Sequence, residues 1–236
     1  MLFFLLSWLF ALPDAYHVQY LERIQTNNNP PVLVLISPGW TEQLLEPLLS
    51  QLWTEGFAVW SLRFAHHAQT DTQMLESIAT AIEKHQKPFV VSQGFSGRML
   101  LKHADTFAPH ISGVALLASP IASFCSPALE KALQGGSWSA VDHPPLSQAS
   151  PSFHQDLWRA CQQREILKPL FTNIWAATTN GNPIVPPENI RPYLGDDHQF
   201  LRIGPLALQG SEPSYQELFA HPATLSALSS WIRSQR

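Results

Sequence analysis

Apolar residues follow two different periods along the chain. Short continuous apolar runs, such as residues 32–36 (VLVLI), are too short for a helix and have no polar face, which is typical of buried strands in a parallel sheet. Between these runs lie segments such as residues 41–53, in which leucine recurs at the spacing of an amphipathic helix. The same reasoning predicts further strands at 57–62, 89–92, 114–118, 171–177 and 198–203, and further helices at 72–85, 97–105 and 223–232.

The order of these elements predicts the fold class. Strands alternate with helices, and parallel neighbours need crossover connections, so we expect an α/β protein with a doubly wound, mostly parallel sheet. Residues 16–24 (YHVQYLERI) alternate apolar and polar positions and predict one more strand, half-buried.

The regular alternation breaks between residues 119 and 169. Glycine and proline there separate two short helical stretches, 127–133 and 153–166. An insertion of this size in a regular α/β chain usually covers the sheet end where such folds bind ligands, so we expect a small cap. The predicted organisation is one domain over residues 14–236 that includes this cap, preceded by an apolar segment at residues 1–13.

Composition excludes several kinds of function. The chain has 236 residues, of which 45% are hydrophobic, enough for one well-buried core. Lys and Arg number 14 and Asp and Glu 18, a net charge of −4 without a basic block, so we expect no nucleic-acid partner. The two cysteines, Cys125 and Cys161, match neither a zinc site nor a redox pair, and the histidines have no metal-binding spacing. We therefore expect neither a metal nor a cofactor.

Four motifs resemble the α/β-hydrolase superfamily, in the right order from about residue 16 to the C-terminus. They are VLVLISPGW, FVVSQGFSGRMLLKHA, NIWAATTNGNPIVPPENI and ELFAHPATLSALSSWI. They are similar, in turn, to the family's oxyanion loop, nucleophile turn, acid loop and the segment that enters the last helix. The resemblance implies the family's fold, and it raises the question of whether a catalytic triad is present.

The nucleophile turn can be aligned in two registers. This turn needs small residues two positions before and two positions after its apex. With Gly94 at the apex the flanking residues are Ser92 and Ser96, whereas with Ser96 at the apex they are Gly94 and Arg98. Steric fit favours Gly94, which has no side chain to attack a substrate.

The other catalytic positions also depart from the family pattern. Asn182 aligns where the resemblance implies an acid, and Glu188 reads as a polar residue in the first turn of a short helix. Residues 204–220 contain no histidine, and His221, followed by Pro222, reads as the cap of the last helix. The oxyanion loop has proline where the family has histidine, although the resemblance leaves the backbone N–H groups of Trp40 and Phe95 as candidate oxyanion donors.

These departures favour a non-catalytic hydrolase-fold protein that acts in binding, or as a subunit or scaffold of a membrane-associated complex. Its partner would be an apolar protein or a membrane surface, and its cleft would take at most a small apolar ligand. The alternative is a serine ester hydrolase, of esterase, lipase or acyl-transfer type, that uses Ser96 with His221 and an acid not identified. A third hypothesis is a hydrolase with another nucleophile, such as Cys125.

The segment from Leu2 to Leu12 (LFFLLSWLFAL) is about half the length of a membrane span. It lacks the basic residues and cleavage site of a secretory signal, since the first basic residue is Arg23. A cleaved signal, packing against the body of the protein, and docking onto a lipid surface or an apolar partner remain open, and the last is our prediction.

Deletion of this segment tests the prediction. We expect the full-length chain to float with liposomes, and a chain that starts at Asp14 to remain in the soluble fraction, because the large apolar side chains of the segment leave water in the bilayer. Equal flotation of the two chains contradicts anchoring. A mature N-terminus downstream of Pro13 identifies the segment as a cleaved signal.

Overall fold

The computed structural model describes residues 29–37, 40–64, 71–122, 166–180, 185–204 and 217–235, together with Asn182 and short pieces between residues 130 and 164. The predicted strand at 16–24 and the segment from Leu2 to Leu12 lie outside the described residues. So do most of the predicted helices at 127–133 and 153–166.

A parallel β-sheet forms the centre of the molecule. Its order is β2-β1-β3-β4-β5-β6, and each neighbouring pair is parallel, which confirms the predicted fold class. The strands are β1 (Pro31–Ile36), β2 (Ala58–Arg63), β3 (Phe89–Gln93), β4 (Gly113–Leu117), β5 (Ile174–Thr179) and β6 (Gln199–Ile203).

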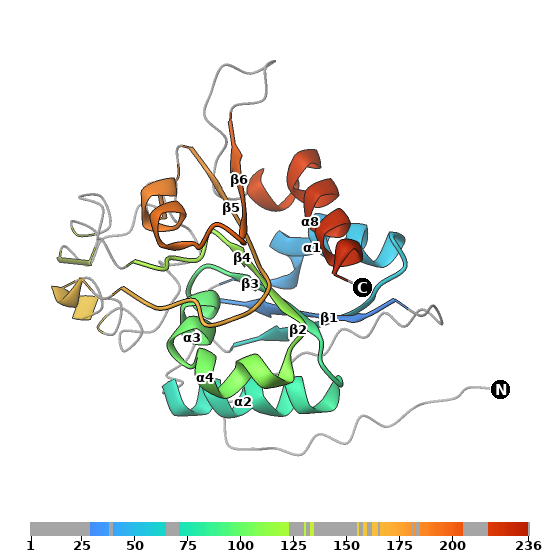
Figure 1. The fold of residues 1–236 in the computed structure, drawn as a ribbon, viewed down its shortest axis with the longest axis horizontal. Helices are drawn as coiled ribbons and strands as arrows, with labels where there is room; N and C mark the ends of the chain where they lie inside the picture. Colours follow the sequence, from blue (N-terminus) through green and yellow to red (C-terminus); the bar gives the residue numbers. More distant parts are fainter. Residues whose placement is uncertain are drawn as a thin grey trace.

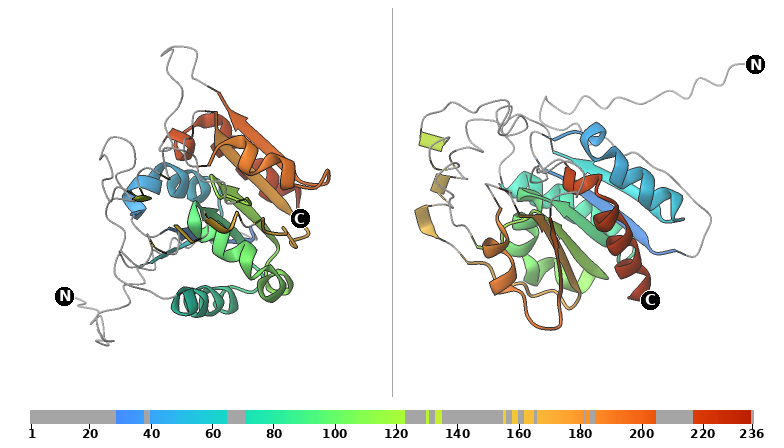
Figure 2. Two further views of the ribbon diagram at one scale, coloured as in Figure 1. Left: turned by 90° about the vertical axis from the view of Figure 1, so that its left-hand side faces the viewer. Right: turned by 90° about the horizontal axis from the view of Figure 1, so that it is seen from above.

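Helices cover both faces of this sheet. Figure 1 shows α1 (Glu42–Thr54) and α8 (Pro222–Ser234) together on one face. The other face carries α2 (Asp71–Lys84), α3 (Phe95–Lys102) and α4 (Ala104–Phe107). The two views of Figure 2 show the same layers from other directions. Short 3₁₀ helices complete the described chain: η1 (Ala108–His110), η2 (Pro187–Asn189), η3 (Arg191–Tyr193) and η4 (Glu217–Phe219).

The apolar periods of the sequence explain which residues form the core. Residues 32–36 of β1 are fully buried because strands on both sides and helices on both faces enclose them. In α1 the leucines at positions 45, 48, 49 and 52 are buried, the three- and four-residue spacing that faces a helix toward a sheet. The edge strand β6 is exposed or half-buried along most of its length, and only its last residue, Ile203, is buried.

Most predicted elements differ from the structure by one or two residues, and two of them differ by three residues at one end. The helix predicted at 97–105 begins earlier, at Phe95, and ends at Lys102, and α4 follows after His103, whose φ of −120° interrupts the helix. The strand predicted at 171–177 begins only at Ile174. Asn173 forms a bend before it, and its side-chain amide donates to the carbonyl of Ser112 at 3.0 Å.

The chain leaves the sheet after β4 and returns to the same place before β5. An isolated antiparallel bridge joins Ala122 to Ile166, and the backbone N–H of Leu167 donates to the carbonyl of Ile121 at 3.0 Å. The segment predicted as a cap therefore starts and ends side by side.

A close contact between α3 and the end of β4 yields a testable prediction. A Cβ atom on Gly97 would lie 2.2 Å from Oγ and 2.5 Å from Cβ of Ser119, so Gly97→Ala should lower the free energy of unfolding by about 1–3 kcal/mol. Adding Ser119→Gly should recover part of this loss, as measured by urea unfolding, because Oγ of Ser92 would still lie 2.7 Å from the new Cβ.

The control is Gly195→Ala, at an exposed glycine where a new Cβ atom would meet nothing closer than 3.7 Å. It should change the free energy of unfolding by less than about 0.5 kcal/mol. Equal unfolding midpoints for Gly97→Ala and the wild type would contradict the close contact.

Candidate active site at the carboxyl ends of β1 and β3

The candidate site lies at the point in the sheet where the order of successive strands changes direction. From β1 the chain crosses to β2 on one side, whereas β3, on the other side of β1, leads to β4. Connections that leave in opposite directions open a crevice between the carboxyl ends of two strands, and α/β proteins bind ligands in such crevices. Here the crevice is bordered by Ser37, directly after β1, and Gly94, directly after β3.

Gly94 forms a sharp turn between β3 and α3. Its φ is 59° and its ψ is −123°, a backbone conformation that costs a residue with a side chain about 1–3 kcal/mol. Its N–H donates to the carbonyl of Leu117 at 2.9 Å, and α3 begins at the next residue, Phe95. The structure therefore places Gly94 at the strand-to-helix turn, and the first N–H groups of a helix follow it.

Ser96 lies inside the protein rather than at the apex of this turn. Its side chain is fully buried, and its hydroxyl lies 2.9 Å from the carbonyl oxygen of Leu35 and 2.8 Å from that of Gln93. The same oxygen accepts the N–H of Gln93 at 3.2 Å. Ser96 thus joins the end of β1 to the turn after β3.

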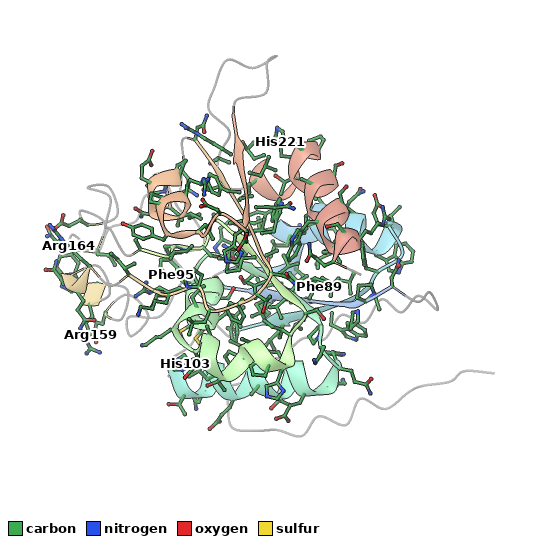
Figure 3. All side chains as sticks on the ribbon, viewed as in Figure 1. Phe89, Phe95, His103, Arg159, Arg164 and His221 are labelled. Carbon is green, nitrogen blue, oxygen red and sulfur yellow. The ribbon has the colours of Figure 1, made fainter. Side chains whose placement is uncertain are left out.

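The neighbouring residue, Phe95, lies at the carboxyl end of β3. In Figure 3 it is on the side of the described cap pieces that carry Arg159 and Arg164, whereas Phe89, at the start of β3, lies toward the opposite side of the molecule. The end of β3 that carries the turn is therefore the end that faces the cap segment.

Trp40 occupies the loop between β1 and α1. Its side chain is only 2% exposed, and its ring meets that of Phe219 edge-on, with 5.5 Å between the centroids. Its N–H, a predicted oxyanion donor, donates to the carbonyl of Ser37 at 3.0 Å. In this conformation the N–H of Trp40 closes a turn, so it reaches a substrate oxygen only after that bond opens.

Asn182, at the position of the family's acid, stabilises the loop after β5. Its side-chain carbonyl accepts the N–H of Val185 at 2.9 Å, and its amide lies 3.5 Å from the hydroxyl of Thr178. The Thr178 hydroxyl in turn donates to the carbonyl of Val185 at 2.8 Å. Glu188 lies exposed in the first turn of η2.

His221 is the N-cap residue of α8, and Pro222 is the first residue of the helix. The Nδ1 atom of His221 accepts the N–H of Ala223 at 3.2 Å. A nitrogen that accepts this bond carries no proton, so a neutral ring has its proton on Nε2. In this cap the Nε2 atom of His221 is a donor and takes no proton from a serine.

A partly buried ion pair lies directly after the loop that carries Trp40. Glu42, the first residue of α1, is 8% exposed, and its Oε2 lies 3.2 Å from Nη1 of Arg63, the last residue of β2. The negative charge also suits the N-terminus of a helix. The pair therefore links the start of α1 to the end of β2.

Cys125, the alternative nucleophile, lies outside the described residues, and so does Cys161. Within the described ranges, no group of three or more His, Cys, Asp or Glu side chains could hold a metal ion. No described helix is long and apolar enough to cross a membrane. No sequence pattern indicates a role for Ser37, because its contacts with residues 93 and 96 depend on the pairing of β1 with β3.

Comparison with solved structures places the fold among hydrolases. A monoacylglycerol lipase from Paleococcus ferrophilus superposes with a TM-score of 0.64 at 17% identity, covering 94% of this chain and 100% of that chain. A bacterial membrane phospholipase A gives 0.65 at 15% identity, covering 94% and 86%. An enol-lactonase from Burkholderia xenovorans LB400 gives 0.62 at 12% identity, covering 92% and 96%. No protein-family model and no curated protein sequence matches the chain.

These similarities overturn the interpretation of the chain as a non-catalytic binding protein or scaffold, which was wrong. The similar structures are named as lipases, esterases and a lactonase, so the fold favours the alternative of an ester hydrolase. The interpretation rested on unsuitable side chains at three aligned positions. Such positions do not establish the loss of a catalytic site, because residues 65–70, 123–129 and 205–216, which follow β2, β4 and β6 in the sequence, lie outside the described residues.

The sheet order, the turn at Gly94 and the superpositions over more than nine-tenths of the chain agree with one another. This protein has the α/β-hydrolase fold.

Proposed function

We propose that the protein is a hydrolase that cleaves carboxylic esters at the turn formed by Gly94. The observation that carries this proposal is the backbone of Gly94, with φ 59° and ψ −123°, placed between a buried parallel strand and the first residue of a helix. Only glycine takes this conformation without strain, and the tight turn it allows brings the N-terminus of the next helix to the carboxyl end of the strand, where α/β folds bind their ligands.

The chemistry needed for ester cleavage fits the N-terminus of α3. Attack on an ester carbonyl turns its oxygen into an anion, and preformed N–H donors stabilise that charge. The first N–H groups of a helix have no partner within the helix, and the helix dipole adds a partial positive charge there. The N–H of Phe95 is the first of these groups after Gly94.

The substrate class follows from the side chains around the crevice. Trp40 and Phe219 form an aromatic contact beside the oxyanion loop, and Phe95 borders the turn. Trp40 and Phe219 are buried, so a substrate reaches them only if the oxyanion loop opens, whereas Phe95 is partly exposed. All three side chains are apolar and favour an ester with an uncharged, apolar acyl group.

Ser96 stays a predicted nucleophile. Attack by its hydroxyl requires Oγ to leave the carbonyls of Leu35 and Gln93, to which it lies within 2.9 Å. A nucleophile from another part of the chain needs no such rearrangement. Hydrolysis should therefore be lost in Ser96→Ala if Ser96 is the nucleophile, and retained if another residue is.

The test is ester hydrolysis by the purified full-length chain. We expect p-nitrophenyl esters of short and medium acids to be hydrolysed at least about 10⁶-fold faster than without catalyst, as for an ordinary enzyme. The matched control is Ser61→Ala, which removes a buried serine hydroxyl that has no hydrogen-bond partner, and it should hydrolyse like the wild type.

Labelling with a fluorophosphonate identifies the route. Labelling and hydrolysis that both disappear in a folded Ser96→Ala variant assign the nucleophile to Ser96. Labelling that persists in this variant shows that Ser96 is not the nucleophile and leaves ester hydrolysis in place. No hydrolysis of esters, thioesters or lactones by the wild type would contradict the proposed function.

A further inference from the structure

We propose that Ser37 is a positioning residue that fixes the oxyanion loop and the Gly94 turn relative to each other. The expected effect of Ser37 on kcat rests on the proposed function. The hydrogen bonds of Ser37 can be tested without any substrate.

The side chain of Ser37 contacts the turn from the neighbouring strand. Its hydroxyl donates to the carbonyl of Gln93, the residue before Gly94, and accepts the N–H of Ser96 at 2.9 Å. The N–H of Ser37 also donates to the side-chain carbonyl of Gln93 at 3.2 Å. Three hydrogen bonds thus connect one serine to both sides of the turn.

These hydrogen bonds support a turn that the strand pairing does not reach and a helix whose N-cap residue has no side chain. The pairing between β1 and β3 ends at Leu35 and Ser92, so the backbone ladder no longer supports the residues beyond it. The N-cap residue of α3, Gly94, has no side chain to accept an N–H from the first turn of the helix. The hydroxyl of Ser37 accepts the N–H of Ser96 instead, and so caps α3 from another strand.

The same residue also holds the oxyanion loop. The carbonyl of Ser37 accepts the N–H of Trp40 at 3.0 Å. Ser37 thus accepts the N–H of Trp40 with its carbonyl and the N–H of Ser96, the residue after Phe95, with its hydroxyl. It therefore fixes the resting position of the oxyanion loop at Trp40 relative to the turn that precedes Phe95.

Glycine makes such external support necessary. A glycine has more conformational freedom to lose than any other residue, so Gly94 permits the φ of 59° without enforcing it. Ser37 is 2% exposed, so water does not compete for its bonds. We therefore expect removal of the hydroxyl to loosen the turn without unfolding the protein.

Hydrogen exchange tests the structural part. In Ser37→Ala the backbone amide of Ser96 loses its acceptor and should exchange about fivefold faster or more, as measured by NMR under native conditions. The control Ser61→Ala changes a buried serine of the adjacent strand β2 that has no hydrogen-bond partner, and exchange at Ser96 should stay as in the wild type. Unchanged exchange at Ser96 in Ser37→Ala overturns the inference, whether or not the protein is a hydrolase.

Kinetics test the positioning role. We expect Ser37→Ala to lower kcat for p-nitrophenyl butyrate by about 10–100-fold, the effect of a small misplacement of catalytic groups, with KM within about twofold of the wild type. Ser37→Thr retains the hydroxyl and should recover most of kcat. Faster exchange at Ser96 with unchanged kcat would overturn the positioning role, and so would a Ser37→Thr variant that folds and is as slow as Ser37→Ala. An inactive wild type contradicts the proposed function, and the exchange measurement still decides whether Ser37 holds the turn.

Discussion

The turn at Gly94 is the constraint on which the candidate site depends. A buried parallel strand must change direction within one residue so that α3 can pack back against the sheet, and the φ of 59° makes this possible. The close packing that follows leaves no room for a side chain at Gly97, one turn into the helix. A turn this tight brings the N-terminus of a helix to the crevice between β1 and β3, where it can stabilise a developing negative charge.

Polar side chains at the candidate catalytic positions and beside the turn mostly stabilise the structure. Ser96 and Ser37 complete hydrogen bonds that the ends of the strands leave open, and Asn182 does the same for the loop after β5. His221 caps the last helix. Their chemistry matches residue types found in active sites, yet most of their described side-chain bonds are to the backbone, where an unmade bond would cost about 1–3 kcal/mol. The catalytic groups of an ester hydrolase must therefore include residues beyond these four, or these side chains must change partners during the reaction.

The sequence predicted the sheet and most helices because apolar periodicity is local. Residues 32–36 and the leucines of α1 lie where their pattern places them. The turn at Gly94 could also be predicted, from the small residues on either side. What the sequence did not indicate depends on contacts between distant segments: the start of α3 at Phe95, the clash that a side chain at Gly97 would make with Ser119, and the bonds of Ser37. Ser37 and Ser96 are 59 positions apart, and only the pairing of β1 with β3 brings them together.

The central claim is that the turn at Gly94 holds the reacting carbonyl of an ester. A crystal structure of the full-length protein with a bound alkylboronate, which mimics the tetrahedral intermediate, tests it most directly. The account predicts a boronate oxygen within hydrogen-bond distance of the backbone N–H of Phe95, with the alkyl group toward the Trp40 and Phe219 side chains. A boronate that inhibits hydrolysis but binds away from this turn would contradict the account.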